Sequence, residues 1–229
     1  MPLSDIELYY TPKENIEGNV ISVFGEEFRH AVKVMRNKMG DIIYITSGTG
    51  SIFKSEISTI EYEKLTAKII DEIVNRNDLE NIFFCISKLK NPERFKFALE
   101  KCVELGVINF IIFESERTIS KGSNIKRWER IALAAMKQSI RSHLPQIGLV
   151  NSLKEIKNFL GEKIVFDQNT KQQFKFNYDS KKKYYFIFGP EGGLSENELN
   201  LFKADELFSI SKNRLRSETA IVKVASSLI

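Results

Sequence analysis

Two segments near the end of the chain carry the residue types best suited to bind a small ligand. Gly189-Pro-Glu-Gly-Gly193 follows the apolar run Tyr184–Phe188, and Leu215-Arg-Ser-Glu-Thr-Ala220 comes shortly after the apolar run Leu207–Ile210. Both runs have the length and composition of β-strands, and a helical pattern follows each segment. Glycines let a ligand approach the backbone, and ligands of open α/β sheets bind beyond the carboxyl ends of the strands. We therefore expect one pocket, built largely from main chain.

The charged residues of these segments have more than one interpretation. Glu191 is suited to accept a hydrogen bond from a ribose hydroxyl or an amine, or to bond backbone N–H groups of its turn. Arg214 and Arg216 lie in a polar loop, where a guanidinium can hold an anionic or planar group. Glu218 either takes part in chemistry or favours the dipole of the helix that Ser217 would cap.

The signatures of several other enzyme classes are missing from the sequence. It contains no P-loop, no H-E-x-x-H and no G-x-S-x-G. Gly48-Thr-Gly50 begins like a dinucleotide fingerprint, but Phe53 stands where the third glycine is required. With two histidines and two cysteines, we expect no metal site. Cys85 and Cys102 form neither a Cys-x-x-Cys motif nor a disulfide framework, so we interpret them as buried thiols of a cytoplasmic protein.

The charge of the chain is unevenly distributed. Residues 1–72 hold 8 Lys and Arg against 12 Asp and Glu, whereas residues 73–229 hold 26 against 18. Between residues 117 and 143 there are 7 basic residues and a single acid, Glu129. Such a cluster suits a nucleic-acid backbone, and a solvated helix face is an equally good interpretation from charge alone. The apolar stretches are strand-sized and the first residues do not resemble a signal peptide, so we expect no membrane segment.

The pattern of elements predicts two domains. Residues 18–72 read as a small β-rich, barrel-like module with strands over 19–24, 41–46, 51–60 and 65–70 and a helix over 26–35. A polar linker covers 72–81. Beyond it, strands (82–87, 107–113, 163–166, 184–188, 207–210) alternate with helices (91–105, 124–144, 153–160, 195–202, 217–228), which indicates a parallel sheet covered on both faces. Asn91 is the expected N-cap of the first of these helices, and Ser195 with Glu198 forms a capping box.

Taken together, these motifs resemble the RsmE family, the 16S rRNA uridine-N3 methyltransferases of the SPOUT superfamily. The resemblance rests on Phe188-Gly-Pro-Glu-Gly-Gly-Leu-Ser-x-x-Glu198 and on Leu215–Ala220. Further matches follow in the family's order: His30-x-x-x-Val34-x-Arg36 with Gly40-Asp41, Lys101-x-x-Glu104-Leu-Gly-Val107, Ser115-Glu-Arg-Thr118, and Trp128 with Ala134-Ala-x-x-Gln138-Ser-x-Arg141 and Pro145. The match spans nearly the whole chain.

The resemblance implies the fold and the cofactor. Residues 1–72 would form a PUA-like RNA-binding β-barrel, and residues 73–229 an α/β SPOUT methyltransferase domain whose parallel sheet ends in a C-terminal trefoil knot. S-adenosylmethionine would lie in the knot, held by the loop after Phe166, the glycine-rich turn and the loop 210–215. The cofactor-binding residues that this implies are Phe166, Phe188, Gly189, Glu191, Gly192, Gly193, Ile210, Ser211, Asn213 and Leu215.

The resemblance also implies the substrate, N3 of one uridine (U1498) in 16S rRNA of the small ribosomal subunit, and a homodimer. We expect Arg216 to stabilise the anion that forms when the N3 proton leaves. Glu218 would accept that proton or orient the arginine. The expected RNA contacts are Lys33, Arg36, Arg117, Lys121, Arg127, Arg141 and Arg214. A SPOUT methyltransferase acting on tRNA and a non-catalytic RNA-binding factor are the alternatives.

Overall fold

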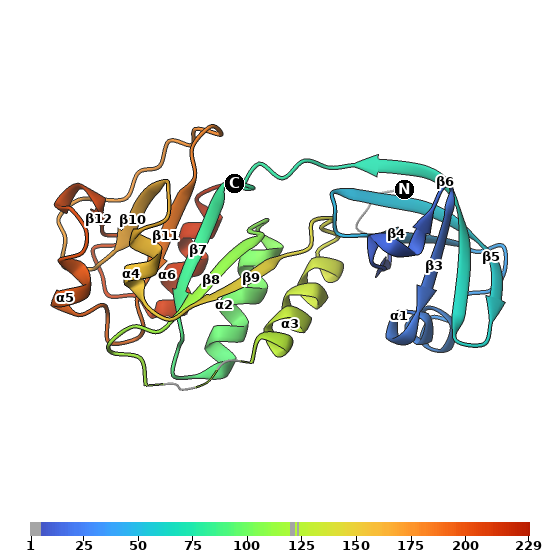
Figure 1. Cartoon of the computed structure of the whole chain (residues 1–229), viewed down its shortest axis with the longest axis horizontal. Helices are drawn as coiled ribbons and strands as arrows, with labels where there is room; N and C mark the ends of the chain where they lie inside the picture. The colour runs from blue at the N-terminus through green and yellow to red at the C-terminus, as the bar shows by residue number, and fades with distance from the viewer. Residues whose placement is uncertain (1–5, 120–121, 123) are drawn as a thin grey trace. The chain divides into compact units, whose positions relative to one another are not determined.

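The computed structural model describes residues 6–119, 122 and 124–229, so Lys121 lies outside the described residues (Figure 1). The chain divides into two compact units. One runs to Asn77 and takes in Leu133–Leu144, and the other comprises Asp78–Ala132 and Pro145–Ile229. The first unit therefore contains residues 133–144, which the sequence pattern placed in the second domain.

The first unit is built on a six-stranded sheet with the order β1-β4-β5-β6-β3-β2. All neighbouring strands are antiparallel except β1 and β4, which run parallel. The expected barrel-like β-rich module is present, but β1 and β2 were not predicted because they are only three and two residues long. The elements are β1 (Leu8–Tyr10), η2 (Lys13–Asn15), β2 (Ile16–Glu17), β3 (Val20–Phe24), α1 (Gly25–Arg29), η3 (His30–Val34), β4 (Ile42–Thr46), β5 (Ser51–Glu61) and β6 (Lys64–Val74).

The Gly48-Thr-Gly50 turn has a packing role. Residues 142–144 lie against it, and Gly50 N–H donates to the Ser142 carbonyl at 2.9 Å. A Cβ on Gly48 would approach Leu144 Cβ to 2.5 Å, and one on Gly50 would approach His143 Nε2 to 2.9 Å. Both glycines also have positive φ angles, of 75° and 105°. The glycines thus make room for another chain segment, as a hairpin turn and not as a nucleotide loop.

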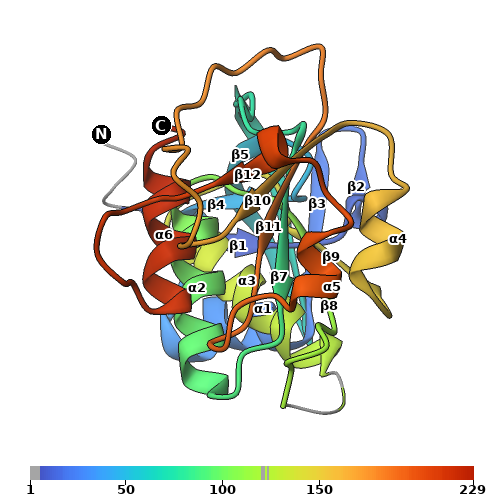
Figure 2. The ribbon, with the colours of Figure 1, turned by 90° about the vertical axis from the view of Figure 1, so that its left-hand side faces the viewer.

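The second unit contains a six-stranded sheet whose strands are all parallel, in the order β12-β10-β11-β7-β8-β9. Helices α4 and α5 cover one face, and α2 and α6 the other (Figure 2). The predicted α/β class is therefore confirmed. The elements are β7 (Ile82–Ser87), α2 (Pro92–Glu104), β8 (Asn109–Phe113), α3 (Ile125–Gln138), β9 (Gln146–Val150), α4 (Leu153–Lys157), β10 (Glu162–Phe166), β11 (Tyr184–Phe188), α5 (Glu196–Leu199), η4 (Ala204–Glu206), β12 (Leu207–Phe208) and α6 (Ser217–Ser226).

The helix expected over residues 124–144 ends early. It stops at Gln138, and Ile140 takes a positive φ of 55°. The chain then turns so that Leu144 N–H donates to the Gly48 carbonyl. Strand β9, which follows, was not predicted, because Gly148 and the polar Gln146 weaken its β-strand pattern. The expected N-cap at Asn91 and the capping box of Ser195 and Glu198 are both confirmed.

The connection between β10 and β11 is an extended segment where a helix is usual. Residues 171–178, here called the strap, lie against one face of the sheet (orange in Figure 2). Phe174 packs edge-on against Phe166, Phe186 and Phe208, and Phe176 packs against Tyr184 and Phe186. These aromatic contacts attach the strap to β10, β11 and β12. The trefoil knot stays a prediction.

Two features of the described residues bear on the expected absences. No described helix is long and apolar enough to cross a membrane. In the same part of the chain, no three His, Cys, Asp or Glu side chains lie together as a metal site would require.

Both thiols are predicted to be unreactive in the native protein. Cys85 and Cys102 are fully buried, and burial raises the pKa of each thiol well above its usual range. A raised pKa lowers the thiolate fraction, and the thiolate is the reactive form. Ellman's reagent at mildly alkaline pH should label neither cysteine until guanidinium unfolds the chain. Rapid stoichiometric labelling of the native protein would contradict this.

Candidate active site at the carboxyl ends of three parallel strands

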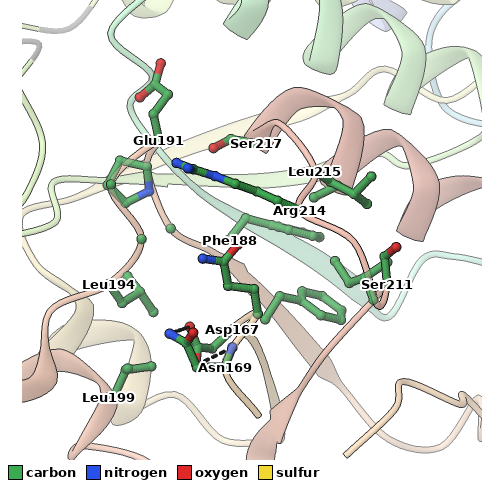
Figure 3. Close-up of a pocket in the computed structure, with 18 of the residues that line it drawn as sticks. Asp167, Asn169, Phe188, Glu191, Leu194, Leu199, Ser211, Arg214, Leu215 and Ser217 are labelled. Carbon is green, nitrogen blue, oxygen red and sulfur yellow. Dashed lines mark hydrogen bonds between the residues drawn. The ribbon is translucent and has the colours of Figure 1, made fainter. Parts of the chain in front are cut away.

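A cavity of about 370 Å³ opens at the carboxyl ends of β10, β11 and β12 (Figure 3). The last residues of these strands, Phe166, Phe188 and Phe208, all line it. The sheet register aligns Phe166 with Phe188 on one side and with Phe208 on the other. The Phe166 and Phe188 rings stack with centroids 4.8 Å apart. Strand register thus brings three loops together around an aromatic floor.

The glycine-rich turn forms one wall, and its glycines serve different purposes. Only Gly193 has a positive φ, of 70°. A Cβ on Gly189 would come within 3.0 Å of the Leu194 backbone nitrogen, so the neighbouring backbone leaves little room for a side chain at this position. A Cβ on Gly192 would meet only Arg117 side-chain atoms, at 3.7 Å. Each of the three glycines therefore answers a separate constraint of the turn.

The buried carboxylate of Glu198 fixes the turn to a neighbouring loop. Glu198 is only 5% exposed. Its Oε2 accepts from Ser115 Oγ at 2.9 Å and from Ser195 N–H at 2.8 Å, and its Oε1 accepts from Glu116 N–H at 3.0 Å. Hydrogen bonds to an ionised acceptor are about twice as strong as neutral ones. One side chain therefore joins the start of α5 to the loop after β8.

Arg117 adds a second link between the same two loops. Its Nη1 donates to the Gly192 carbonyl at 2.8 Å, and the residue lines the cavity. The segment that carries it is itself held, because Thr118 Oγ1 accepts from Ser115 N–H and lies 2.9 Å from Ser87 Oγ. Arg117 was expected to contact RNA, and here it forms part of the cavity wall.

Glu191 lines the cavity, but its carboxylate points away from the centre of it (Figure 3). Both oxygens accept from the backbone N–H of Lys90, at 2.9 and 3.2 Å. Of the interpretations offered for this residue, the structure favours a backbone partner. That partner lies in the loop after β7 and not in the turn of Glu191 itself.

The remaining walls are the loops after β10 and β12. Asp167 accepts from the backbone N–H of Asn169 at 3.2 Å and closes a tight turn. In the other loop, Lys223 Nζ donates to the Ile210 carbonyl at 3.1 Å, and Asn213 N–H donates to Ser211 Oγ at 3.2 Å. The loop after β10 is thus held by a bond within itself, and the loop after β12 by an internal bond and by Lys223 of α6.

The cavity brings together all ten residues expected to bind the cofactor. It also includes Arg117 and Arg214 from the expected RNA contacts. Lining residues that were not among the expected binding residues are Pro190, Leu194, Glu196, Leu199, Phe208, Ser217, Ala220 and the triplet Asp167, Gln168 and Asn169. Asp167–Asn169 form the loop after Phe166, so the predicted end of that strand already indicated that this loop lies at the cavity.

The two expected catalytic residues are not among the cavity-lining residues. Arg216 is exposed and is the N-cap residue of α6. Glu218 is buried, and its Oε1 lies 3.5 Å from Nε of Arg94 on α2. Its Oε2 is buried with no hydrogen-bond partner among the described residues. Ser217 is the first residue of the helix and makes no capping bond, so the N-cap interpretation of Ser217 is wrong.

The other expected RNA contacts are spread over both units. Lys33 and Arg36 are exposed in the first unit, where Arg36 takes a positive φ of 60°. Arg127 on α3 pairs with Glu93 at 3.1 Å. Arg141 is exposed but lies beyond the end of α3, not on it.

Comparisons with known proteins point in one direction. Residues 76–229 match a family model described as an RNA methyltransferase domain, and residues 25–70 match one described as an RNA methyltransferase PUA domain. The chain is 28% identical to ribosomal RNA small subunit methyltransferase E of Bacillus subtilis, over 95% of this chain and 93% of that protein. It is 30% identical to ribosomal RNA small subunit methyltransferase E 2 of Borreliella burgdorferi, over 90% of each chain.

A solved structure agrees with these matches. Ribosomal RNA small subunit methyltransferase E from Neisseria gonorrhoeae, bound to S-adenosyl methionine, superposes with a TM-score of 0.86 at 25% identity. The match covers 97% of this chain and 96% of that one. The fold of this chain is therefore that of the Neisseria enzyme over nearly its whole length.

Glu198→Gln is predicted to loosen the cavity. The amide would place an NH₂ group against N–H donors and remove the charge from the remaining hydrogen bonds, at a cost of about 2 kcal/mol. The thermal midpoint should fall by several degrees. Glu116→Gln is the matched control, because only the backbone of Glu116 takes part. Equal melting curves for the two variants would show that the Glu198 carboxylate does not hold these loops.

Proposed function

We propose a function from one premise: the chain belongs to the ribosomal RNA small subunit methyltransferase E (RsmE) family. It transfers a methyl group from S-adenosylmethionine to N3 of a uridine, U1498, in 16S rRNA. The observation that carries this proposal is the cavity at the ends of β10, β11 and β12, because all the residues assigned to the cofactor line it.

The residues of the cavity fit S-adenosylmethionine. A volume of about 370 Å³ lies within the range of small-molecule sites. Phe188, Leu194 and Leu199 offer apolar surface for an adenine ring, and the loops after the three strands offer main-chain donors and acceptors. Gly192 lines the cavity, and a Cβ there would meet only side-chain atoms of Arg117, so backbone does not cover this part of the turn. When bound, S-adenosylmethionine supplies an electrophilic methyl group on a sulfonium sulfur.

The chain's own residues would bind and orient the base. The N3 proton of uridine must pass to water at the open side of the site, and the negative charge that develops spreads to the O2 and O4 carbonyls. Arg216 is the proposed donor to one of these oxygens, because a guanidinium stabilises such charge. Glu218 acts as a positioning residue: its pairing with Arg94 on α2 holds the start of α6, which carries Arg216. Arg214, on the rim of the cavity, would bind a neighbouring phosphate.

The proposal includes the setting in which the protein works. Its partner is the small ribosomal subunit in the cytoplasm, with Lys33 and Arg36 of the PUA domain among the RNA contacts. We also propose a homodimer. Phe97 on α2 is 44% exposed and Val222 on α6 only partly buried, so the neighbouring helices α2 and α6 offer an apolar surface.

Transfer of labelled methyl groups tests the function directly. With labelled S-adenosylmethionine, the protein should label rRNA in small ribosomal subunits, and nuclease digestion should release N3-methyluridine. Arg216→Ala should lower transfer by roughly a hundredfold, the usual effect of removing one such donor, at unchanged cofactor affinity. Labelling of tRNA instead would assign the protein to a different substrate. Absence of S-adenosylmethionine binding would indicate a non-catalytic RNA-binding factor.

Gly192→Val is predicted to weaken cofactor binding while the protein stays folded. The new Cβ fits beside Arg117, but the two methyl groups would occupy space that the ligand needs. Overpacking of about 1.4 kcal/mol or more corresponds to at least a tenfold loss of affinity by calorimetry. Gly148→Val in β9 is the matched control, because its Cβ would make only an ordinary contact, 3.8 Å from the Phe110 carbonyl. Equal affinity of both variants for S-adenosylmethionine would contradict this placement.

A further inference from the structure

The strap carries a basic surface that the proposed function does not yet use. Within the strap, residues 171–178, the chain has two lysines and no acid, and Asp179 and three further lysines follow by residue 183. Lys171 and Lys175 are exposed, and neither forms an ion pair with any residue that the structure describes. By contrast, Lys182 pairs with Glu162 at 3.0 Å. Two lysines of the strap are therefore available to a partner.

The alternation of the strap fixes the direction of these side chains. Phe174, Phe176 and Tyr178 contact aromatic rings of the sheet. In an extended segment, successive side chains point to opposite faces. Lys175, between two inward-facing phenylalanines, points outward, whereas Lys171 lies in the bend where the strap begins and is placed at the surface by its exposure. The pattern is the one expected of a segment with an apolar inner face and a charged outer face.

The strap is firmly attached beside the cavity. Phe174 N–H donates to the Ser209 carbonyl at 2.9 Å, and Ser209 N–H donates to the Gln172 carbonyl at 2.7 Å. Gln173 Nε2 also donates to Ser209 Oγ at 2.7 Å. Ser209 directly precedes the loop 210–215, and Lys171 comes two residues after Asn169, which lines the cavity. A surface that is already ordered loses little entropy when it binds.

We propose that the outer face of the strap, through Lys171 and Lys175, binds phosphates of the RNA next to the reacting uridine. This inference rests on the proposed function. RNA is the partner that the charge favours, because each neutralised phosphate releases counterions. A backbone that passes Asp167–Asn169 meets Lys171 first and Lys175 next. The strap thus extends the binding surface from the reacting base to the flanking chain.

The double variant Lys171→Gln/Lys175→Gln tests the inference. Its affinity for 16S rRNA should fall roughly tenfold at moderate salt, and the slope of log K against log salt should become shallower by about 1.4 to 2. Its melting curve and its affinity for S-adenosylmethionine should match those of the wild type. The matched control is Lys154→Gln/Lys203→Gln, which removes two exposed lysines from the other face of the sheet. That control should keep the wild-type slope.

Each other outcome contradicts the inference. If the strap variant keeps the wild-type affinity and slope while the wild type methylates rRNA, the proposed function stands and the strap does not bind RNA. If both double variants lose the same affinity, the effect is one of net charge and not of the strap. If the wild type binds no RNA and transfers no methyl group, the inference and the proposed function fail together.

Discussion

The candidate site depends on one buried interaction, the carboxylate of Glu198 with its three donors. A backbone N–H or C=O group that binds a ligand is not available for a hydrogen bond within its own loop, because each residue carries at most one main-chain donor and one acceptor. The turn 189–193 stabilises itself through the hydrogen bond from Gly193 N–H to the Pro190 carbonyl, 2.9 Å long, and receives further support from outside. The buried Glu198 carboxylate provides that support, because it accepts hydrogen bonds from Ser115 Oγ and from the backbone N–H groups of Ser195 and Glu116. The Arg117 bond to Gly192 completes the attachment.

This arrangement suits the chemistry proposed for the site. Methyl transfer needs an aligned donor and acceptor more than it needs strong acids or bases. The cavity is accordingly lined by strand ends, glycines and short loops, with few titratable side chains, and two arginines lie at its edge. Strands β10, β11 and β12 support the loops that line the cavity, whereas the exposed Arg214 and Arg216 are available to the RNA.

Much of this could be predicted from the sequence, because the signals were local. Strand β11 and its glycine-rich turn are marked by a continuous apolar run followed by Gly and Pro, and parallel strand ends necessarily meet at one edge.

The features that could not be predicted depend on contacts between residues distant in sequence. The end of α3 at Gln138 follows from bonds to residues 48–50, and the strap owes its course to rings on β10, β11 and β12. Likewise, the sequence indicated only the capping-box role of Glu198, because its partners Ser115 and Glu116 lie more than 80 residues away along the chain. The pairing of Glu218 with Arg94 has the same non-local origin.

The central claim is that this chain modifies N3 of one uridine in small-subunit rRNA. The most direct measurement is mass spectrometry of nucleosides from that rRNA, taken from cells that lack the gene and from the same cells complemented with it. The account predicts that N3-methyluridine is absent without the gene and returns with it. Persistence of the modified nucleoside in the deletion strain, with no second enzyme present, would contradict the claim.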